Sequence, residues 1–354
     1  MAEIESGQNR TFDGDPNFMR LTARFLRHPA LPALALAFAF SGTCAAASAA
    51  PATAAEWPKG PLHIIVPYGP GSTPDLMARI VADGLAKRTG QPAIVENKAG
   101  AAGNIGTDAI AKAAPDGQTF GISIAGPLGV NALLFKHMPY DPAKDLELVS
   151  IAATQPSVLV VPNRLGVNNT EELLALLKKN PGKYNYASMG AGSISHLAME
   201  ALAARSGTQI VHVPYAGSGP AVTALLAGNA DVAVLPAAAV MGQVKAGKLK
   251  ALAVATGKRS SSIPELPTLE EAGLKDVKAD AWMGFAVPAK TPQPIVAKIH
   301  DEIVQILEQP DVKEKLKPLY MEVVADTPAE ARSWLDADIE RWRPIIQKNK
   351  ITLD

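Results

Sequence analysis

The stretch Leu62 to Arg79 reads Leu-His-Ile-Ile-Val-Pro-Tyr-Gly-Pro-Gly-Ser-Thr-Pro-Asp-Leu-Met-Ala-Arg, and it decides the fold. Its apolar, β-branched beginning predicts a buried strand that stops at Pro67. Helical periodicity begins at Leu76, after a loop that contains two glycines. The free backbone N–H groups and the dipole of a helix start favour an anion. The stretch therefore predicts a backbone-lined anion pocket, with an ordinary strand-to-helix connection as the alternative.

Two polar residues of this loop have the spacing of a capping box. Ser72 stands where it would cap the helix, and Asp75 follows three residues later. Pro74 suits the first helical turn, because its missing N–H costs nothing there. The loop holds no Lys or Arg, so a carboxylate is the leading candidate for the anion.

Length and charge bound the class of protein. With 354 residues, the chain is too long for one average domain and natural for two lobes. It is 47% hydrophobic, and its 34 Lys and Arg balance 34 Asp and Glu. Neither a nucleic-acid partner nor a charged membrane surface is indicated by this balance.

The N-terminal region has the pattern of a secretory leader. Residues 1–18 are polar and acidic, which favours a translation start at Met19. Residues 19–55 then form a signal peptide with a basic start, an apolar segment (Ala30 to Phe40) and a small-residue cleavage site at Ala47-Ser48-Ala49. We therefore expect the mature protein in the periplasm.

Cys44 is the single cysteine of the chain. It follows Ser-Gly-Thr, a poor lipidation signal, and cleavage after Ala49 removes it. The mature protein would then have no disulfide and no cysteine metal site.

Strand and helix patterns alternate after the first helix. They predict an α/β fold in which each lobe is a doubly wound, mainly parallel sheet with flanking helices. Gly100, Gly103 and Gly106 have G-x-x-G-x-x-G spacing, which is not the dinucleotide fingerprint. We interpret them as a second strand-to-helix turn, and we expect no cofactor.

Two crossings divide the predicted fold. The chain leaves the first lobe near Val158 and returns near Trp282, so residues 56–157 and 282–354 form lobe I and residues 158–281 form lobe II. A hinge with a cleft between the lobes follows from these crossings. The amphipathic helices Pro292 to Leu307 and Pro328 to Ile346 suit the outer face of lobe I.

A short echo links the two predicted lobes. Val66-Pro67-Tyr68 recurs as Val213-Pro214-Tyr215, each time at a strand end before a helix. We interpret the two loops as counterparts.

Catalytic patterns are weak in this chain. Ser193 and Ser195 lie beside His196, but the surrounding residues are not a G-x-S-x-G elbow and no third member is evident. A periplasmic hydrolase is a remote alternative, and His196 is expected to donate to a ligand or to pack against the lobe. The remaining mature histidines lack ligand spacing, so no metal site is expected. Loops rich in Gly, Ser and Thr suit reversible binding of a small carboxylate.

Several ordered motifs closely resemble the Bug family, the periplasmic receptors of tripartite tricarboxylate transporters. The resemblance runs from about Trp57 to the C-terminus. Its motifs are Val66-Pro67-Tyr68 with Pro70-Gly71, Val95 to Gly106, Pro115-Asp116-Gly117, Pro139 to Pro142, Tyr186-Ala187-Ser188, Gly192-Ser193, His196-Leu197-Ala198, His212 to Tyr215, Lys245 to Leu249, and Ala251 to Val254.

The resemblance implies a two-lobed periplasmic binding protein of type II that closes over a carboxylate and hands it to membrane subunits. In that family main-chain N–H groups and waters hold the carboxylate, at loops that correspond here to Tyr68 to Thr73 and Ser188 to Ser193. Ser72 replaces a glycine that is frequent in the family. Ala216 replaces a common lysine, and the loss of this cation argues against a highly charged ligand. An extracytoplasmic sensor subunit that presents its solute to a signalling partner remains an alternative.

The predicted partners are a small carboxylate and transporter membrane subunits, and we expect a monomer. The predicted ligand-binding residues are Tyr68, Gly71, Ser72, Thr73, Asp75, Ala125, Ser188, Gly192, Ser193, His196, Tyr215, Gly217 and Pro236.

Overall fold

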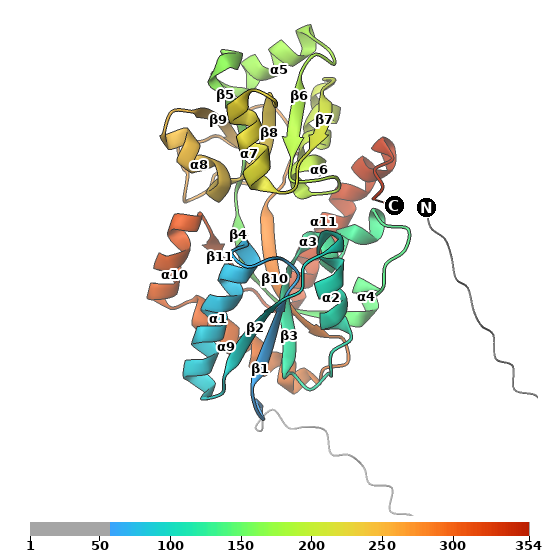
Figure 1. Ribbon diagram of the computed structural model, residues 1–354, viewed down its shortest axis with the longest axis vertical. Coiled ribbons are helices and arrows are strands. Elements are labelled where there is room, and N and C mark those ends of the chain that lie inside the picture. The colour runs from blue at the N-terminus through green and yellow to red at the C-terminus, as the bar shows by residue number, and fades with distance from the viewer. Residues whose placement is uncertain (1–56, 354) are drawn as a thin grey trace, which may run out of the picture. The chain divides into compact units, whose positions relative to one another are not determined.

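A computed structural model describes residues 57–353, and the expected leader lies outside them. Its strands form a six-stranded and a five-stranded sheet (Figure 1). We call each sheet with its helices the first lobe and the second lobe. The strands are β1 (Leu62–Val66), β2 (Ala93–Asn97), β3 (Thr119–Ile124), β4 (Leu146–Gln155), β5 (Ser157–Pro162), β6 (Asn185–Ser188), β7 (Val211–Pro214), β8 (Val232–Pro236), β9 (Leu249–Val254), β10 (Ala281–Pro288) and β11 (Glu322–Val323).

Helices flank both sheets (Figure 1). The α-helices are α1 (Thr73–Thr89), α2 (Asn104–Ala111), α3 (Ala125–Leu128), α4 (Pro142–Asp145), α5 (Thr170–Lys179), α6 (Ile194–Ser206), α7 (Ser218–Ala227), α8 (Ala237–Lys245), α9 (Gln293–Leu307), α10 (Pro310–Leu316) and α11 (Pro328–Asn349). Short 3₁₀ turns are η2 (Ala101–Gly103), η3 (Val130–Leu133), η4 (Asn163–Leu165) and η5 (Lys317–Leu319).

The two sheets share one topology. The first has the order β11-β4-β10-β3-β1-β2 and the second β7-β6-β8-β5-β9. In the first, β1 pairs in parallel with β2 and β3, and β10 pairs antiparallel with β3 and β4. In the second, β6 pairs in parallel with β7 and β8, and β5 pairs antiparallel with β8 and β9. Strand β1 is therefore the counterpart of β6.

This topology confirms the two-lobed α/β fold class and corrects one detail of it. The sheets are mixed rather than mainly parallel, because β10 in the first sheet and β5 in the second run antiparallel to both of their neighbours. Strand β4 ends at Gln155 and β5 begins at Ser157, whereas a longer segment joins β9 to β10. The sequence pattern of a strand predicts that the strand exists and that it is buried, but it does not distinguish parallel from antiparallel pairing.

Local sequence explains where α1 lies. Strand β1 is almost entirely buried, which its run of apolar residues requires. Helix α1 carries Pro74 in its first turn and Lys87 and Arg88 in its last. It ends at Gly90, whose left-handed φ of 70° allows its N–H to bond Ala86 O. The dipole of α1 is thus complemented at the C-terminus, and its N-terminus stays open toward the β1–α1 loop.

Gly106 explains the Gly-rich segment after β2. A Cβ atom at this position would lie 2.5 Å from Pro67 Cα and 2.7 Å from Lys98 O. Helix α2 can approach the end of β1 this closely only with glycine there. The spacing of the glycines therefore serves helix–strand packing.

Helix α11 covers both lobes, which corrects its expected place on the outer face of the first lobe alone. Its first half places Ala331 and Leu335 in a cluster with residues of β4 and β10. Its second half places Trp342 and Ile346 in the core cluster of the second lobe, together with Val130 of η3. The amphipathic pattern shows that a face is buried, but it does not identify the partner.

No helix within residues 57–353 is both long enough and apolar enough to span a membrane.

Candidate functional site

The predicted site residues lie at the carboxyl ends of parallel strands. In the first lobe, the β1–α1 loop and Ala125, the first residue of α3, follow two paired parallel strands. In the second lobe, Ser188 lies beside Pro214 across the β6–β7 pair, and Tyr215 N–H donates to Ser188 O at 3.1 Å. Pro236 ends the neighbouring parallel strand β8. Each lobe thus gathers its predicted residues at one sheet edge.

Asp75 organises the β1–α1 loop. Its carboxylate accepts hydrogen bonds from Gly71 N–H at 2.8 Å, from Arg79 through both oxygens at 3.0 Å, and from Asn97 Nδ2 at 2.9 Å. The residue is 1% exposed. Burial alone would raise the pKa of Asp75, but these hydrogen bonds and the charge of Arg79 outweigh burial and lower the pKa. These hydrogen bonds hold the β1–α1 loop together, and the contact of Asp75 with a ligand stays a prediction.

The capping box predicted for α1 is absent. Ser72 is the N-cap, with φ −67° and ψ 158°, yet its side chain makes no capping hydrogen bond. Asp75 instead reaches the N–H of Gly71, one residue before the cap. The Ser72 Oγ and Tyr68 Oη atoms are both buried and have no hydrogen-bond partner among the described residues. Unpaired buried hydroxyls are rare and costly, so they point to a missing partner.

The β6–α6 loop has all its hydroxyls paired. Ser193 caps α6 by accepting from His196 N–H at 3.4 Å, and its Oγ also donates to Gly190 O at 2.6 Å. Ser195 Oγ accepts from Met189 N–H at 2.8 Å. Ser188, fully buried, exchanges hydrogen bonds with Gly190.

The two loops are built on one plan, Gly-x-Gly-Ser-x-x followed by Asp75 or His196. Gly71 and Gly192 have left-handed φ angles of 79° and 73°. The serines that follow them have nearly the same backbone angles, φ −67° and ψ 158° against φ −66° and ψ 159°. Gly192 N–H donates to His196 Nδ1 at 3.0 Å, as Gly71 N–H donates to Asp75. Residues 69–75 and 190–196 are therefore counterparts.

This correspondence corrects the echo expected between Val66-Pro67-Tyr68 and Val213-Pro214-Tyr215. The second of these segments follows β7, an edge strand, whereas β1 and β6 lie between two parallel neighbours. Strand order decides which loops correspond, and three identical residues do not.

Several backbone N–H groups at the two helix starts are free. The N–H groups of Thr73 and Asp75 in α1, and of Ile194 and Ser195 in α6, meet no acceptor among the described residues. Both helices exceed twelve residues, with 17 and 13. Each therefore presents unpaired donors and a positive dipole end.

A histidine pair supports the β6–α6 loop. The rings of His196 and His212 stack with centroids 3.9 Å apart, and Tyr186 stacks on His212 at 4.8 Å. His212 Nε2 lies 2.7 Å from Ser188 Oγ. Burial lowers the pKa of His196 to about 4, and burial with the neighbouring His196 does the same for His212. His212 is thus a hydrogen-bonded structural residue of β7.

The geometry does not favour a serine hydrolase. His196 Nδ1 faces a backbone N–H, and Ser193 pairs with Ser195 and Gly190 instead. Among the described residues of this loop, the hydrogen bond between a serine hydroxyl and a histidine ring joins Ser188 to His212, and Ser188 is fully buried. A nucleophile must reach its substrate, so this pair is structural.

Asn97 supports the β1–α1 loop and is not among the residues predicted from the sequence. Its Nδ2 donates to Tyr68 O and to Asp75 Oδ1, both at 2.9 Å. Asn97 is the last residue of β2 and pairs with Val66 of β1. Its side chain therefore connects the end of β2 to the β1–α1 loop. A polar residue at the end of the strand adjacent to β1 was the available signal.

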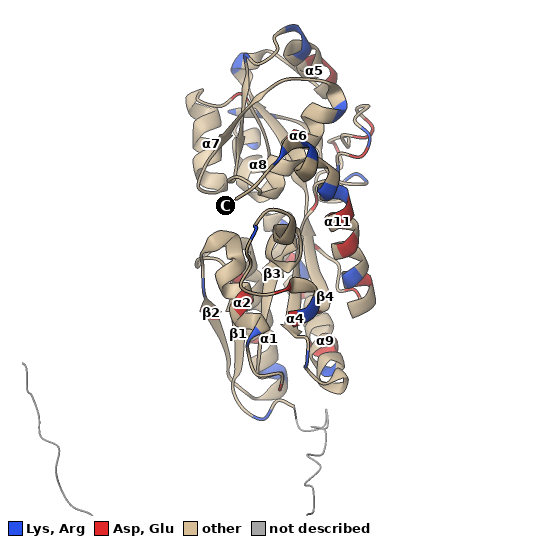
Figure 2. Ribbon diagram, turned by 90° about the vertical axis from the view of Figure 1, so that its right-hand side faces the viewer, with Lys and Arg blue, Asp and Glu red and all other residues tan. Residues whose placement is uncertain are grey.

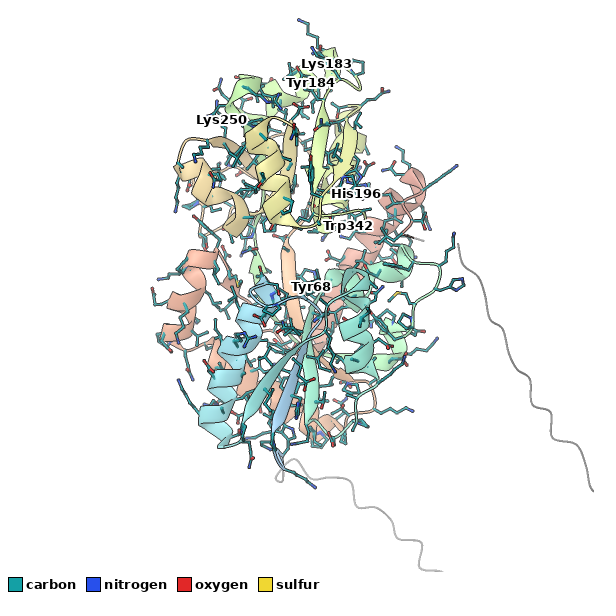
Figure 3. The ribbon with its side chains drawn as sticks, viewed as in Figure 1. Tyr68, Lys183, Tyr184, His196, Lys250 and Trp342 are labelled. Carbon is teal, nitrogen blue, oxygen red and sulfur yellow. The ribbon has the colours of Figure 1, made fainter. Side chains whose placement is uncertain are left out.

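The C-terminal segment reaches the β6–α6 loop. Leu353 N–H donates to Leu134 O at 2.9 Å, and a Cβ atom on Gly192 would lie within 3 Å of both leucine side chains. Figure 3 labels Tyr68 in the first lobe, with His196 and Trp342 in the second-lobe region.

Gly217, another predicted residue, is the N-cap of α7, and its N–H donates to Tyr215 O at 2.9 Å.

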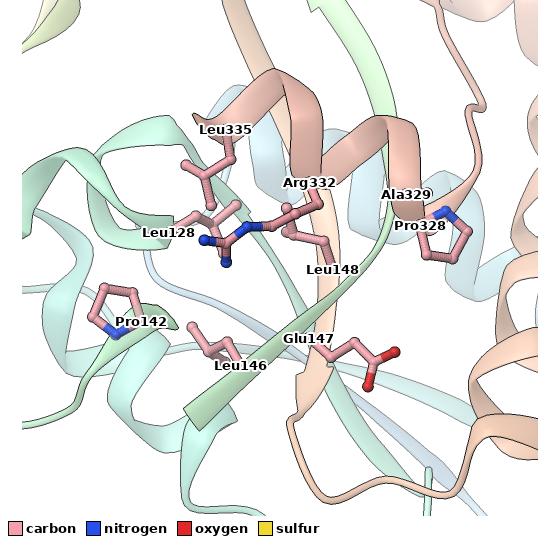
Figure 4. A pocket seen from close by; sticks show the side chains of 9 residues that line it. All are labelled: Leu128, Pro142, Leu146, Glu147, Leu148, Pro328, Ala329, Arg332 and Leu335. Carbon is pink, nitrogen blue, oxygen red and sulfur yellow. The ribbon is translucent and has the colours of Figure 1, made fainter. Parts of the chain in front are cut away.

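Two pockets lie apart from the paired loops. One, of about 320 Å³, is lined by residues of β4, α3, α4 and α11, including Leu128, Glu147 and Arg332 (Figure 4). It contains none of the predicted residues. The other, of about 550 Å³, lies on α7 and includes Tyr215.

Within residues 57–353, no group of three His, Cys, Asp or Glu side chains is placed to hold a metal ion. Charged residues of both signs lie along α11 (Figure 2).

Comparisons with known proteins identify the family. The model of a protein family described as "Tripartite tricarboxylate transporter family receptor" matches residues 77–351 of this chain. Protein BugT of Bordetella pertussis is 37% identical over 303 residues, which cover 85% of this chain and 92% of that protein.

Solved structures agree. An R. palustris protein with adipate is 30% identical, with a TM-score of 0.75 and coverage of 82% of this chain and 97% of that one. MatC from Rhodopseudomonas palustris with bound malate is 30% identical, with a TM-score of 0.72 and coverage of 82% and 100%. The chain belongs to the tripartite tricarboxylate transporter receptor family, whose members include the periplasmic Bug proteins.

Proposed function

We propose that this protein is a periplasmic receptor that captures a small carboxylate between its two lobes and delivers it to a tripartite tricarboxylate-type transporter. The observation that carries the proposal is the pair of matching loops, each with free N–H groups at the start of a long helix. Such groups suit a carboxylate, because they supply donors and a positive dipole end without a fixed cation.

The ligand is a mono- or dicarboxylate rather than a more highly charged acid. No Lys or Arg lies in residues 68–75 or 188–196, and Ala216 follows Val213-Pro214-Tyr215 where the family often has lysine. Structural relatives bound to adipate and malate support this class. We expect the ligand to lie against Thr73, Ser72, Ile194 and Ser195, with a monomer as the working unit and membrane subunits as its partners.

A thermal-shift screen of mono-, di- and aromatic carboxylates tests this proposal. A ligand at 100 times its dissociation constant adds about 2.7 kcal/mol, which raises the melting temperature by roughly a few degrees. A screen in which no carboxylate shifts the melting temperature would count against a carboxylate receptor.

Ser72→Glu then tests the site. Two like charges about 4 Å apart at an effective dielectric near 20 repel by roughly 4 kcal/mol, or about a thousandfold in affinity. The ligand-free protein should melt within a few degrees of the parent, because Ser72 Oγ has no hydrogen bond to lose. Ser333→Glu, on the exposed face of α11, is the matched control. Equal affinity of both variants in calorimetry would place the ligand elsewhere.

A further inference from the structure

Asp75 and His196 occupy the same position in the two paired loops, the third residue after the capping serine. Each accepts the N–H of the glycine four residues earlier, at 2.8 Å and 3.0 Å respectively. Because that N–H is committed, the glycine peptide is held and the next free donors are those of the helix start. The two side chains thus act on the ligand site through the backbone.

The two acceptors differ in charge. Asp75 is an ionised carboxylate enclosed by Gly71, Arg79 and Asn97. His196 accepts through Nδ1, which therefore carries no proton, so the ring is neutral and its proton lies on Nε2. A histidine that gains a second proton can no longer accept at Nδ1.

The surroundings of His196 do not replace this acceptor. On its own helix, Glu200 Oε1 lies 3.9 Å from Nε2. From β7, His212 stacks on the ring, and from β6, Tyr186 stacks nearby and donates to Glu200 at 2.6 Å. From α11, Asn349 donates to the other oxygen of Glu200 at 2.7 Å. His196 is 6% exposed, so its ring is shielded from solvent.

We propose that Asp75 and His196 are matched positioning residues that fix the two carboxylate-binding loops, and that protonation of His196 releases only the loop of the second lobe. This inference rests on the proposed function where it concerns affinity, but the hydrogen bonds themselves can be measured without any ligand. Burial lowers the pKa of His196 to about 4, which places the release in acid.

Nitrogen NMR of the ligand-free protein tests the arrangement directly. At pH 7, His196 Nδ1 should show the shift of an unprotonated ring nitrogen and a scalar coupling to the amide of Gly192. Both signals should disappear on acidification with a midpoint near pH 4, while the amide of Gly71 keeps its shift. A proton on Nδ1 at pH 7, or an absent coupling, would overturn the proposal.

Two variants separate positioning from packing. His196→Asn supplies a neutral acceptor that cannot be protonated, so exchange of the Gly192 amide should stay within about threefold of the parent. His196→Ala removes the acceptor and should speed that exchange by about tenfold or more. Equal exchange rates in the two variants would contradict the assignment. If His196→Ala does not fold, the coupling in the parent still decides.

Affinity provides the functional measurement. For a carboxylate selected by the thermal-shift screen, His196→Asn should bind within about threefold of the parent and lose the weakening below pH 5, whereas His196→Ala should bind about tenfold more weakly. Weakening that persists in His196→Asn would overturn the role of His196 as the sensor. A screen in which nothing binds would refute the proposed function alone, because the NMR result stands separately.

Discussion

At the scale of single residues, Ser72 and Ser193 have the same backbone conformation and different hydroxyl partners. Ser193 caps α6 and bonds Gly190, whereas Ser72 Oγ is buried without a partner. Asp75 and His196 take equivalent loop N–H groups, yet the cap of α1 is left open while that of α6 is closed. The same residue type thus stabilises one loop and is available to a ligand in the other.

Alanine substitutions should separate these roles. Ser193→Ala loses a cap, which costs about 1 kcal/mol and lowers the ligand-free melting temperature by roughly 2–4 °C. Ser72→Ala should leave that temperature unchanged or raise it slightly, because removing an unpaired buried hydroxyl costs little. Calorimetric scans of the ligand-free variants measure both. An equal drop in the two variants would mean that Ser72 has a partner inside the fold.

At the scale of elements, β6, β7 and α6 share a ring stack of the buried Tyr186 and His196 and the half-buried His212. Burial keeps both histidines neutral in the folded protein, with a pKa of about 4 for each. The unfolded chain binds protons near pH 6.5. The stack therefore stabilises the fold above pH 6.5, and this contribution is lost as the pH falls toward 4.

Denaturant unfolding between pH 7 and pH 4 measures this effect. We expect the free energy of unfolding of the parent to fall more steeply than that of His212→Gln, with a difference of about 2 kcal/mol at pH 4. Comparison of the two proteins is needed because Asp280 acts in the opposite direction. Burial raises the pKa of Asp280 to about 6, so the folded state holds a proton there that the unfolded chain has lost. Parallel curves for parent and variant would contradict the role of the stack.

At the scale of the whole molecule, more than the two strand crossings join the lobes. Helix α11 packs against the core of the second lobe and against the cluster formed with β4 and β10 of the first lobe. The 3₁₀ turn η3, which precedes β4 in the chain, also packs with Trp342 in the core of the second lobe. A further contact joins α8 of the second lobe to the residue after η5: Lys245 Nζ lies 5.3 Å from the ring centroid of Tyr320. We therefore expect a closing motion to change these contacts as well as the two connecting segments.

Solution scattering tests closure. The radius of gyration should decrease when a carboxylate selected by thermal shift saturates the protein, because each loop then holds the same ligand. Ser72→Glu at the same carboxylate concentration should keep the ligand-free radius. A parent radius that does not change at saturation would argue that this protein binds without closing.

The sequence by itself determined the strands and helices around the β1–α1 loop and the family of the protein. The run Leu62 to Val66 can only be a buried strand, and the glycines and Pro74 after it allow only a turn and a helix start, since these are local steric properties. The sequence motifs predicted the family, and the comparisons with known proteins confirm this prediction. The leader and its cleavage lie outside the described residues.

Only the tertiary structure decided which strands run antiparallel, that α11 serves both lobes, and that residues 69–75 correspond to residues 190–196. It also assigned Asp75 and His196 to backbone N–H groups and gave Asn97 its place beside Tyr68. These outcomes depend on contacts between residues far apart in the chain. Local propensity does not contain such contacts, because a hydroxyl or carboxylate at a helix start has several partners within reach and packing selects among them.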